Sequence, residues 1–138
     1  MLWGICEASV EKILLDEKPD LLLVYGDTNS TIAGALAAKK IHIKVAHVEA
    51  GLRSFNMDMP EEINRIITDR ISNILFCPTH TAIENLAKEG YENIDAEVVN
   101  SGDVMEDAAL YYEKVSRDKA TVLQAYNLAA SSYYLCTL

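Results

Sequence analysis

The sequence is poor in cysteine and in long apolar runs, and each shortage excludes a class of protein. The three cysteines, Cys6, Cys77 and Cys136, are far apart and form no CxxC pair. We therefore expect reduced thiols in the core of a cytoplasmic protein, and neither a disulfide framework nor a zinc site. No apolar run approaches the length of a membrane-spanning helix, and the start of the chain lacks the basic residues of a signal peptide.

Basic residues are also outnumbered. The 12 lysines and arginines stand against 21 acids, which gives a formal net charge of -9. A field of this sign repels phosphate groups, so we expect no nucleic-acid partner and no membrane partner. A small anionic ligand held by a few local cations stays compatible with this charge.

The motifs that bind common cofactors are missing as well. The sequence has no GxGxxG and no GxxxxGK[ST], so it lacks the phosphate loops of nicotinamide and P-loop proteins. His42, His47 and His80 show no metal-ligand spacing, and a lone strand histidine is most often a hydrogen-bonded core residue. We therefore expect neither a nicotinamide nor a P-loop nucleotide as cofactor, and no metal.

What the sequence does contain is a regular alternation of short apolar runs and helical segments. This alternation predicts right-handed βαβ units in an α/β fold, with a Rossmann-like, doubly wound parallel sheet. Strands are predicted at residues 21–25, 43–48, 74–77, 96–102 and 131–138, and helices at 5–17, 30–40, 60–72, 79–90, 104–115 and 118–126.

Local signals support several of these elements. The continuous apolar run from Leu21 to Tyr25 is typical of a strand buried on both faces of a parallel sheet. Thr79 is suited to cap the helix that follows it, and Gly90 is suited to end that helix. The helix after Pro60 has its isoleucines on one face: Ile63, Ile66, Ile67 and Ile71.

The arrangement of elements predicts a piece of a longer, two-domain protein. The chain opens on a helix, although doubly wound domains normally begin with a strand, and its last apolar run begins a new unit. We assign residues 1–116 to a partial N-terminal Rossmann-like domain, 117–130 to an interdomain connection, and 131–138 to the first strand of a truncated C-terminal domain. An incomplete sheet of this kind is expected to expose apolar surface.

Acids stand where a parallel sheet binds its ligands, beyond the carboxyl ends of the strands. Asp27 follows the first strand and Glu49 follows the second, while Glu61 and Glu62 open the next helix. Asp27, Glu61 and Glu62 also suit the structural role of capping a helix N-terminus. Glu49 has no helix to cap.

Glu49 at a buried strand tip needs a cation, and Arg53 and Arg65 are the expected partners. Several carboxylates in one cleft raise some of their pKa values, which suits general acid and base catalysis near neutral pH. A proton-transfer site without a metal is therefore a hypothesis that the residues themselves support.

Four segments, in this order and spacing, resemble the non-hydrolysing UDP-N-acetylglucosamine 2-epimerases: "PDLLLVYGDTNST", "VAHVEAGLRSFNMDMPEEINRIITDRIS", "LFCPT" and "NSGDVMEDA". The resemblance implies a two-domain fold like that of the GT-B glycosyltransferases, with the active site between two Rossmann-like domains. It also implies the reaction. The C2 proton of UDP-GlcNAc is removed while UDP leaves C1, and both are returned with the opposite configuration at C2, which gives UDP-ManNAc.

By motif, the resemblance implies that Asp27, Glu49 and Glu61 are catalytic and that Arg53 and Arg65 orient these carboxylates or bind substrate. It implies no cofactor and no metal, a UDP-sugar substrate, and we expect a homodimer of the intact parent. The histidine of the family's "HR" motif has no counterpart here, so we expect the chain alone to be inactive. Two alternatives remain open: an epimerase of a UDP-diacetamido-uronic acid, and a noncatalytic sugar-nucleotide-binding domain.

Overall fold

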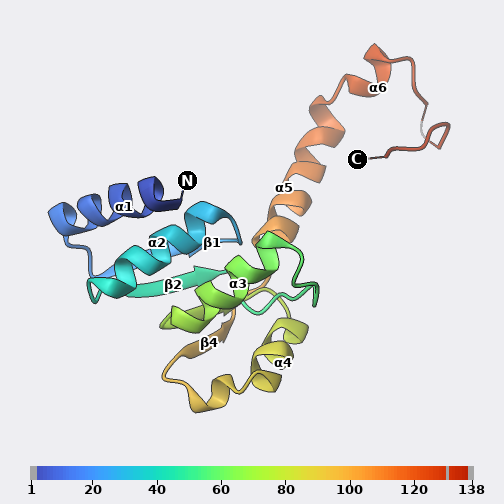
Figure 1. The fold of residues 1–138 in the computed structure, drawn as a ribbon. Helices are drawn as coiled ribbons and strands as arrows, with labels where there is room; N and C mark the ends of the chain where they lie inside the picture. The colour runs from blue at the N-terminus through green and yellow to red at the C-terminus, as the bar shows by residue number, and fades with distance from the viewer. Residues whose placement is uncertain (1–2, 130, 137–138) are drawn as a thin grey trace. The chain divides into compact units, whose positions relative to one another are not determined.

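The computed structural model describes residues 3–129 and 131–136, without the side chains of residues 3–6 and 118 (Figure 1). The chain divides into two compact units, one that ends at Asp103 and one that begins at Val104. The division into 1–116, 117–130 and 131–138 stays a prediction. Within the described ranges, no helix is both long enough and apolar enough to cross a membrane.

The first unit is built on a four-stranded parallel sheet with the strand order β1-β2-β3-β4. Leu22 of β1 lies opposite Val45 of β2, and Leu75 of β3 lies opposite Val98 of β4. This confirms the predicted α/β fold with a Rossmann-like parallel sheet. The strands are β1 (Leu21–Tyr25), β2 (Lys44–Val48), β3 (Ile74–Cys77) and β4 (Glu97–Asn100).

The connecting helices lie on one face of this sheet (Figure 1). Parallel strands that follow one another in chain order and in space place their right-handed crossovers on the same side. The Thr79 hydroxyl accepts a hydrogen bond from the Ala82 amide, and Gly90 follows the helix with φ +80°, so the predicted cap and stop are both confirmed. The helices of this unit are α1 (Trp3–Glu17), α2 (Asn29–Lys40), α3 (Pro60–Ile71), α4 (His80–Lys88) and the short η1 (Tyr91–Asn93).

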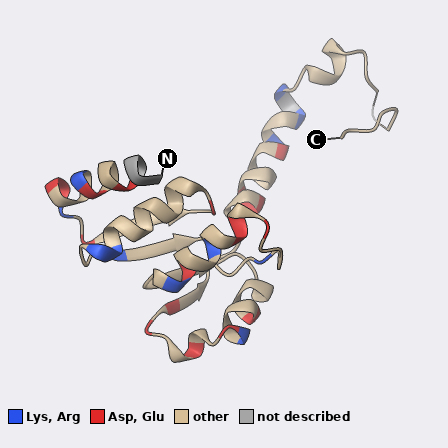
Figure 2. Cartoon of the chain, viewed as in Figure 1, with Lys and Arg blue, Asp and Glu red and all other residues tan. Residues whose placement is uncertain are grey.

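Helix α2 lies close to the sheet because its buried side chains are small. A Cβ atom on Gly34 would lie 3.7 Å from both the Leu22 and the Val24 side chains. Lys39 and Lys40 place the helix's positive charge in its last turn, at the blue end of an otherwise uncharged helix (Figure 2). The core between α1, α2 and the first two strands contains Leu14, Val24, Ala35, Ala37, Ala38 and Val45.

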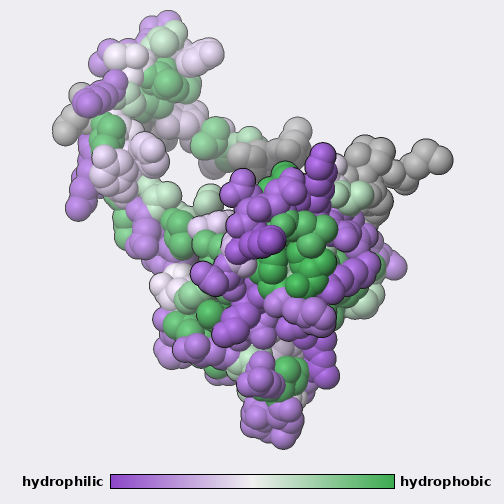
Figure 3. Space-filling view, turned by 90° about the vertical axis from the view of Figure 1, so that its left-hand side faces the viewer, coloured by the Kyte–Doolittle hydropathy of each residue, from purple (hydrophilic) through white to green (hydrophobic). Residues whose placement is uncertain are grey.

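The opposite face of β1 is open, which corrects the prediction of a strand buried on both faces. Leu21, Leu23 and Tyr25 are 41%, 43% and 60% exposed, while Val24 between them is buried. The reason is that helices α2, α3 and α4 all cover the other face. Apolar side chains of β1 are thus exposed, as expected for an incomplete sheet. Figure 3 shows one side of the molecule, where an apolar patch is ringed by hydrophilic residues.

The cysteines fit the expectation only in part. Cys77 is buried and free, and burial, followed by the charge of Asp69, raises the pKa of its thiol to about 11. Cys136 is free but exposed, so its predicted place in the core is wrong. The side chain of Cys6 lies outside the described residues.

The second unit contains α5 (Val104–Lys119) and the short α6 (Val122–Ala125). The first of these extends past its predicted end at residue 115, and the second is shorter than predicted. Residues 131–136 form no strand, which corrects the sequence-based prediction there, and residues 137–138 lie outside the described ranges. A β-strand needs a neighbour for its backbone hydrogen bonds, and these six residues have none in the described sheet.

Candidate functional site

The candidate site lies at the carboxyl ends of β1 and β2. Glu49 directly follows β2, and Asp27 stands two residues beyond the end of β1. Gly26 lies between the end of β1 and Asp27. A Cβ atom built on Gly26 would lie 3.7 Å from Oε2 of Glu49. Its φ of +64° is one that glycine adopts without strain. The two predicted acids therefore share one edge of the sheet, where parallel sheets bind ligands.

Glu49 is held in an unusual backbone conformation. Its φ is +71°, a left-handed value that is uncommon for a residue with a Cβ atom. The half-buried side chain has no hydrogen bond or ion pair with any other described residue. The expected pairing with Arg53 or Arg65 is therefore wrong, because both arginines bind other acids. A strained residue with a free carboxylate at a strand end marks a candidate functional group.

Arg65 on α3 pairs with Asp27. Its guanidinium donates a hydrogen bond to Oδ2 of Asp27, and 3.6 Å separate it from the Glu62 carboxylate. Next to it on the helix, the Asn64 amide donates to the backbone carbonyl of Asp27 at 2.8 Å and to Oδ1 of Asn29 at 3.0 Å. Asp27 is thus fixed both at its backbone and at its side chain.

The neighbouring glutamates of α3 have opposite environments. Glu61 is exposed and has no ionic or hydrogen-bonded partner among the residues that the structure describes. Glu62 is 1% exposed, and its carboxylate accepts hydrogen bonds from the backbone amides of Ser54 at 2.9 Å and Phe55 at 3.0 Å. Burial alone would raise the pKa of Glu62, but these hydrogen bonds outweigh it and lower the pKa. Glu62 therefore holds the loop before α3, and Glu61 is left free for chemistry.

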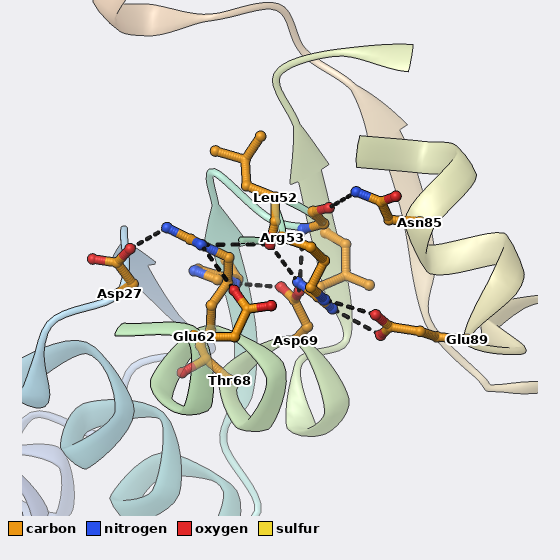
Figure 4. A network of polar contacts seen from close by, with 12 residues as sticks. Asp27, Leu52, Arg53, Glu62, Thr68, Asp69, Asn85 and Glu89 are labelled. Atoms are coloured by element: carbon orange, nitrogen blue, oxygen red, sulfur yellow. Dashed lines mark hydrogen bonds and ion pairs between the residues drawn. The ribbon is translucent and has the colours of Figure 1, made fainter. Parts of the chain in front are cut away.

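Arg53 lies at the buried centre of the same network, because both Arg53 and Arg65 donate a hydrogen bond to the Leu52 carbonyl. It forms two hydrogen bonds with Glu89, of 2.7 and 2.8 Å, and a third of 2.8 Å with Asp69. Its side chain is 1% exposed. Burial alone would lower the pKa of Arg53, but Glu89 and Asp69 together raise it. Figure 4 shows Asp27 at one end of the polar network and Glu89 at the other, with Glu62 and Asp69 between them.

Arg53 therefore contacts none of the three acids that it was predicted to orient, whereas Arg65 contacts one of them. Asn64 and Asp69 were missed, because buried polar residues leave no mark in an apolar pattern. The available signal is the spacing of the polar residues of this helix, since Thr68 follows Asn64 by four positions and Asp69 follows Glu62 by seven, as on one helical face. Helix α3 buries its polar residues Glu62, Asn64, Thr68 and Asp69 and leaves Ile63 and Ile67 exposed.

The arrangement suits proton transfer. Two carboxylates, those of Glu49 and Glu61, are free to accept or donate a proton, and a third, that of Asp27, has its charge balanced by Arg65. Among the described residues, no group of three or more histidine, cysteine and acidic side chains is placed to hold a metal ion.

Fold and site together define a Rossmann-like α/β domain with acidic side chains at the carboxyl ends of its strands. The family model for UDP-N-acetylglucosamine 2-epimerase matches residues 3–138, and the chain belongs to that family. The UDP-2,3-diacetamido-2,3-dideoxy-D-glucuronate 2-epimerase of Pseudomonas aeruginosa is 65% identical over 103 residues, which are 75% of this chain and 29% of that protein. The UDP-N-acetylglucosamine 2-epimerase of Methanocaldococcus jannaschii is 50% identical over 131 residues, which are 94% of this chain and 35% of that protein.

Solved structures of the same family also match this chain. The crystal structure of the Methanocaldococcus jannaschii UDP-GlcNAc 2-epimerase in complex with UDP-GlcNAc and UDP matches with a TM-score of 0.81 and 47% identity. The match covers 91% of this chain and 34% of that one. The chain spans about a third of the length of the relatives that it matches.

Proposed function

We propose that this chain supplies part of the first domain of a longer enzyme, the parent protein, which interconverts UDP-GlcNAc and UDP-ManNAc. The observation that carries this proposal is the difference between the acids at the strand ends. Glu49 and Glu61 have free carboxylates, while Glu62 is occupied by backbone amides and Asp27 by Arg65. A family of C2 epimerases needs groups that take a proton from C2 and return one to it, and free carboxylates serve that purpose.

The reaction conserves atoms and electrons. A carboxylate takes the proton from C2, the electron pair of that C–H bond forms the C1–C2 double bond, and UDP leaves C1 with its bonding electrons. Re-addition of UDP to C1 and of a proton to the opposite face of C2 completes the epimerisation. We assign Asp27, Glu49 and Glu61 jointly to acid, base and positioning roles, with Arg65 orienting Asp27.

Coverage of about a third of each relative supports the expectation that the chain alone is inactive, because the groups facing these acids would come from the rest of the parent. The proposed site of action is the cytoplasm. We also propose that the parent is a homodimer. The exposed Ile63 and Ile67, at 40% and 37%, give α3 an apolar face suited to a protein partner.

A second substrate has a specific observation in its favour. The Pseudomonas aeruginosa relative, at 65% identity, is an epimerase of a UDP-diacetamido-glucuronate. The same acids serve the same proton transfer at C2, and the two sugars differ in the substituents at C3 and C6. The alternative proposal is therefore an epimerase of that nucleotide.

The test is an assay of the purified parent protein with each nucleotide, in which NMR follows exchange of the C2 proton with solvent deuterium. Exchange with UDP-GlcNAc supports the first proposal, and exchange with the diacetamido uronic acid alone supports the second. If the parent binds these nucleotides and catalyses exchange with neither, it is a noncatalytic sugar-nucleotide-binding protein and both proposals fail.

A further inference from the structure

His47, on β2 beside Glu49, is fully buried and has a hydrogen-bond partner at each ring nitrogen. Its Nδ1 lies 2.7 Å from Oδ1 of Asp69, and its Nε2 lies 2.8 Å from the backbone carbonyl oxygen of Gly26. The proposed function makes no use of this side chain. It accounts for neither of these contacts.

The partners determine how many protons the ring carries. A backbone carbonyl oxygen only accepts hydrogen bonds, so Nε2 of His47 must be the donor to Gly26. The Asp69 carboxylate already accepts from the Gly51 amide at 3.1 Å and from Arg53 at 2.8 Å, as an ionised carboxylate does. Nδ1 is then also a donor, and a ring with two donors is an imidazolium.

The surrounding charges balance this cation. Asp69 faces it from α3, and Arg53 and Glu89 lie behind Asp69, so two cations and two anions form one network that is buried except at Glu89, whose side chain is 34% exposed. Two titratable neighbours border this network, the Cys77 thiol on β3 and the Tyr91 hydroxyl on η1, and the pKa of each is raised by burial first and then by the charge of Asp69. Buried charges are tolerated when they are paired in this way.

The imidazolium connects the two segments that carry the predicted acids. Gly26 is held twice by β2, because its amide donates to the Val48 carbonyl at 3.1 Å and its own carbonyl accepts from His47. Asp27 is the next residue. On the other side, Asp69 holds both His47 and the Gly51 amide, which flank Glu49 along the chain.

We propose that His47 is a positioning residue: a buried imidazolium, clamped by Asp69, that holds the Gly26 carbonyl and so fixes Asp27 against Glu49. The part of the proposal that concerns turnover depends on the proposed epimerase function. The part that concerns protonation does not. A displacement of reacting groups by about 1 Å reduces rates by about a hundredfold, so this contact is expected to affect kcat more than KM.

The protonation state is tested by ¹⁵N NMR of the histidine-labelled parent protein, with the His47 signals assigned by their loss in His47→Gln. Protons on both ring nitrogens of His47 at neutral pH support the proposal. A neutral ring with one bare nitrogen overturns it. This result is independent of whether the parent turns over any nucleotide.

The positioning role is tested with a pair of amide variants. The side-chain nitrogen of asparagine takes the place of Nδ1 and that of glutamine takes the place of Nε2, so His47→Gln keeps the donor to Gly26 and His47→Asn loses it. We expect His47→Asn to lower kcat by about a hundredfold with little change in KM, and His47→Gln to stay within about tenfold of the wild type.

Denaturation midpoints of both variants show whether they are folded to the same extent. Equal losses of kcat in two equally stable variants would overturn the positioning role and leave His47 a structural residue. If the parent exchanges the C2 proton of neither nucleotide, the proposed function fails and with it the turnover part of this inference. The NMR result still decides the protonation state.

Discussion

Arg65 on α3 donates a hydrogen bond to Asp27 at the end of β1, and the two residues are 38 positions apart in the chain. This pair distinguishes Asp27 from the other two predicted catalytic acids, because Glu49 and Glu61 have no partner among the described residues. We infer that Arg65 orients Asp27 and that, of the three acids, Glu49 and Glu61 have the carboxylates that are free for proton transfer.

Removal of the Arg65 charge should therefore reduce catalysis, because Asp27 would lose the partner that orients it. In the parent protein, we expect Arg65→Gln to lower kcat/KM by about 10- to 100-fold, which corresponds to the loss of a charged hydrogen bond. Arg70→Gln is the matched control, since Arg70 is exposed on the same helix and contacts the Tyr91 ring. Steady-state kinetics check this, and equal effects of the two substitutions would contradict it.

Glu62 should matter for stability and not for chemistry. Glu62→Gln leaves one of the two amide donors of Ser54 and Phe55 without a carboxylate oxygen, and we expect a loss of about 1–3 kcal/mol in the free energy of unfolding. Glu61→Gln, at the exposed neighbouring position, should stay within about 0.5 kcal/mol of the wild type. Urea denaturation of the parent measures both, and equal losses would show that the buried hydrogen bonds contribute nothing.

The lowered pKa of Glu62 also predicts how the stability of the fold depends on pH. The folded-state pKa of Glu62 is lowered from its ordinary value of 4.5, so its contribution to stability is present above that pH. The contribution is lost as the pH falls below 4.5 and through the lower folded-state pKa. The wild type should therefore lose stability more steeply than Glu62→Gln on acidification, and parallel curves would refute this.

Two glycines with similar backbone angles should respond differently to substitution. Gly51 has φ +77°, and a Cβ atom there would lie 2.5 Å from the backbone oxygen of Ala82. Gly90 has φ +80° and no atom within 4 Å of such a Cβ. We expect Gly90→Ala to cost about 1 kcal/mol, from backbone strain alone, and Gly51→Ala about 3 kcal/mol or more, from strain and overlap together. Urea midpoints of the two variants test the difference, and similar midpoints would contradict the close contact.

Glu49 should show a trade-off between stability and function. Its φ of +71° is unfavourable for any residue with a Cβ atom, so Glu49→Gly should relieve strain and gain about 1 kcal/mol of stability. The same variant lacks the carboxylate and should be inactive. A thermal melt together with a turnover assay checks this, and a lowered melting temperature would show that the Glu49 side chain stabilises the fold.

The four strands of the sheet and the acids at their ends could be predicted from the sequence, because apolar runs and their flanking turns are local features. The buried face of α3 could not. Periodicity identified the isoleucine face, yet Ile63 and Ile67 are exposed while Asp69 is buried. The partners of Asp69, His47 and Gly51, are 22 and 18 positions away, and only the folded chain brings them together.

The open face of β1 and the absence of a strand over residues 131–136 have a related cause. Apolar alternation predicts that a segment suits a sheet, but hydrogen bonding and burial there depend on neighbours. Leu21 and Leu23 remain exposed because the described helices cover the other face of the sheet. Residues 131–136 have no strand to pair with in the described sheet.

Exchange of the C2 proton with solvent deuterium, followed by NMR in the parent protein, tests the central claim most directly. We predict exchange by the wild type with one of the two UDP-sugars, and a loss of about 10²- to 10⁴-fold in Glu49→Gln and in Glu61→Gln. Glu84→Gln, at an exposed position on α4, should exchange at the wild-type rate. Wild-type exchange rates in both Glu49→Gln and Glu61→Gln would contradict the assignment of proton transfer to these carboxylates.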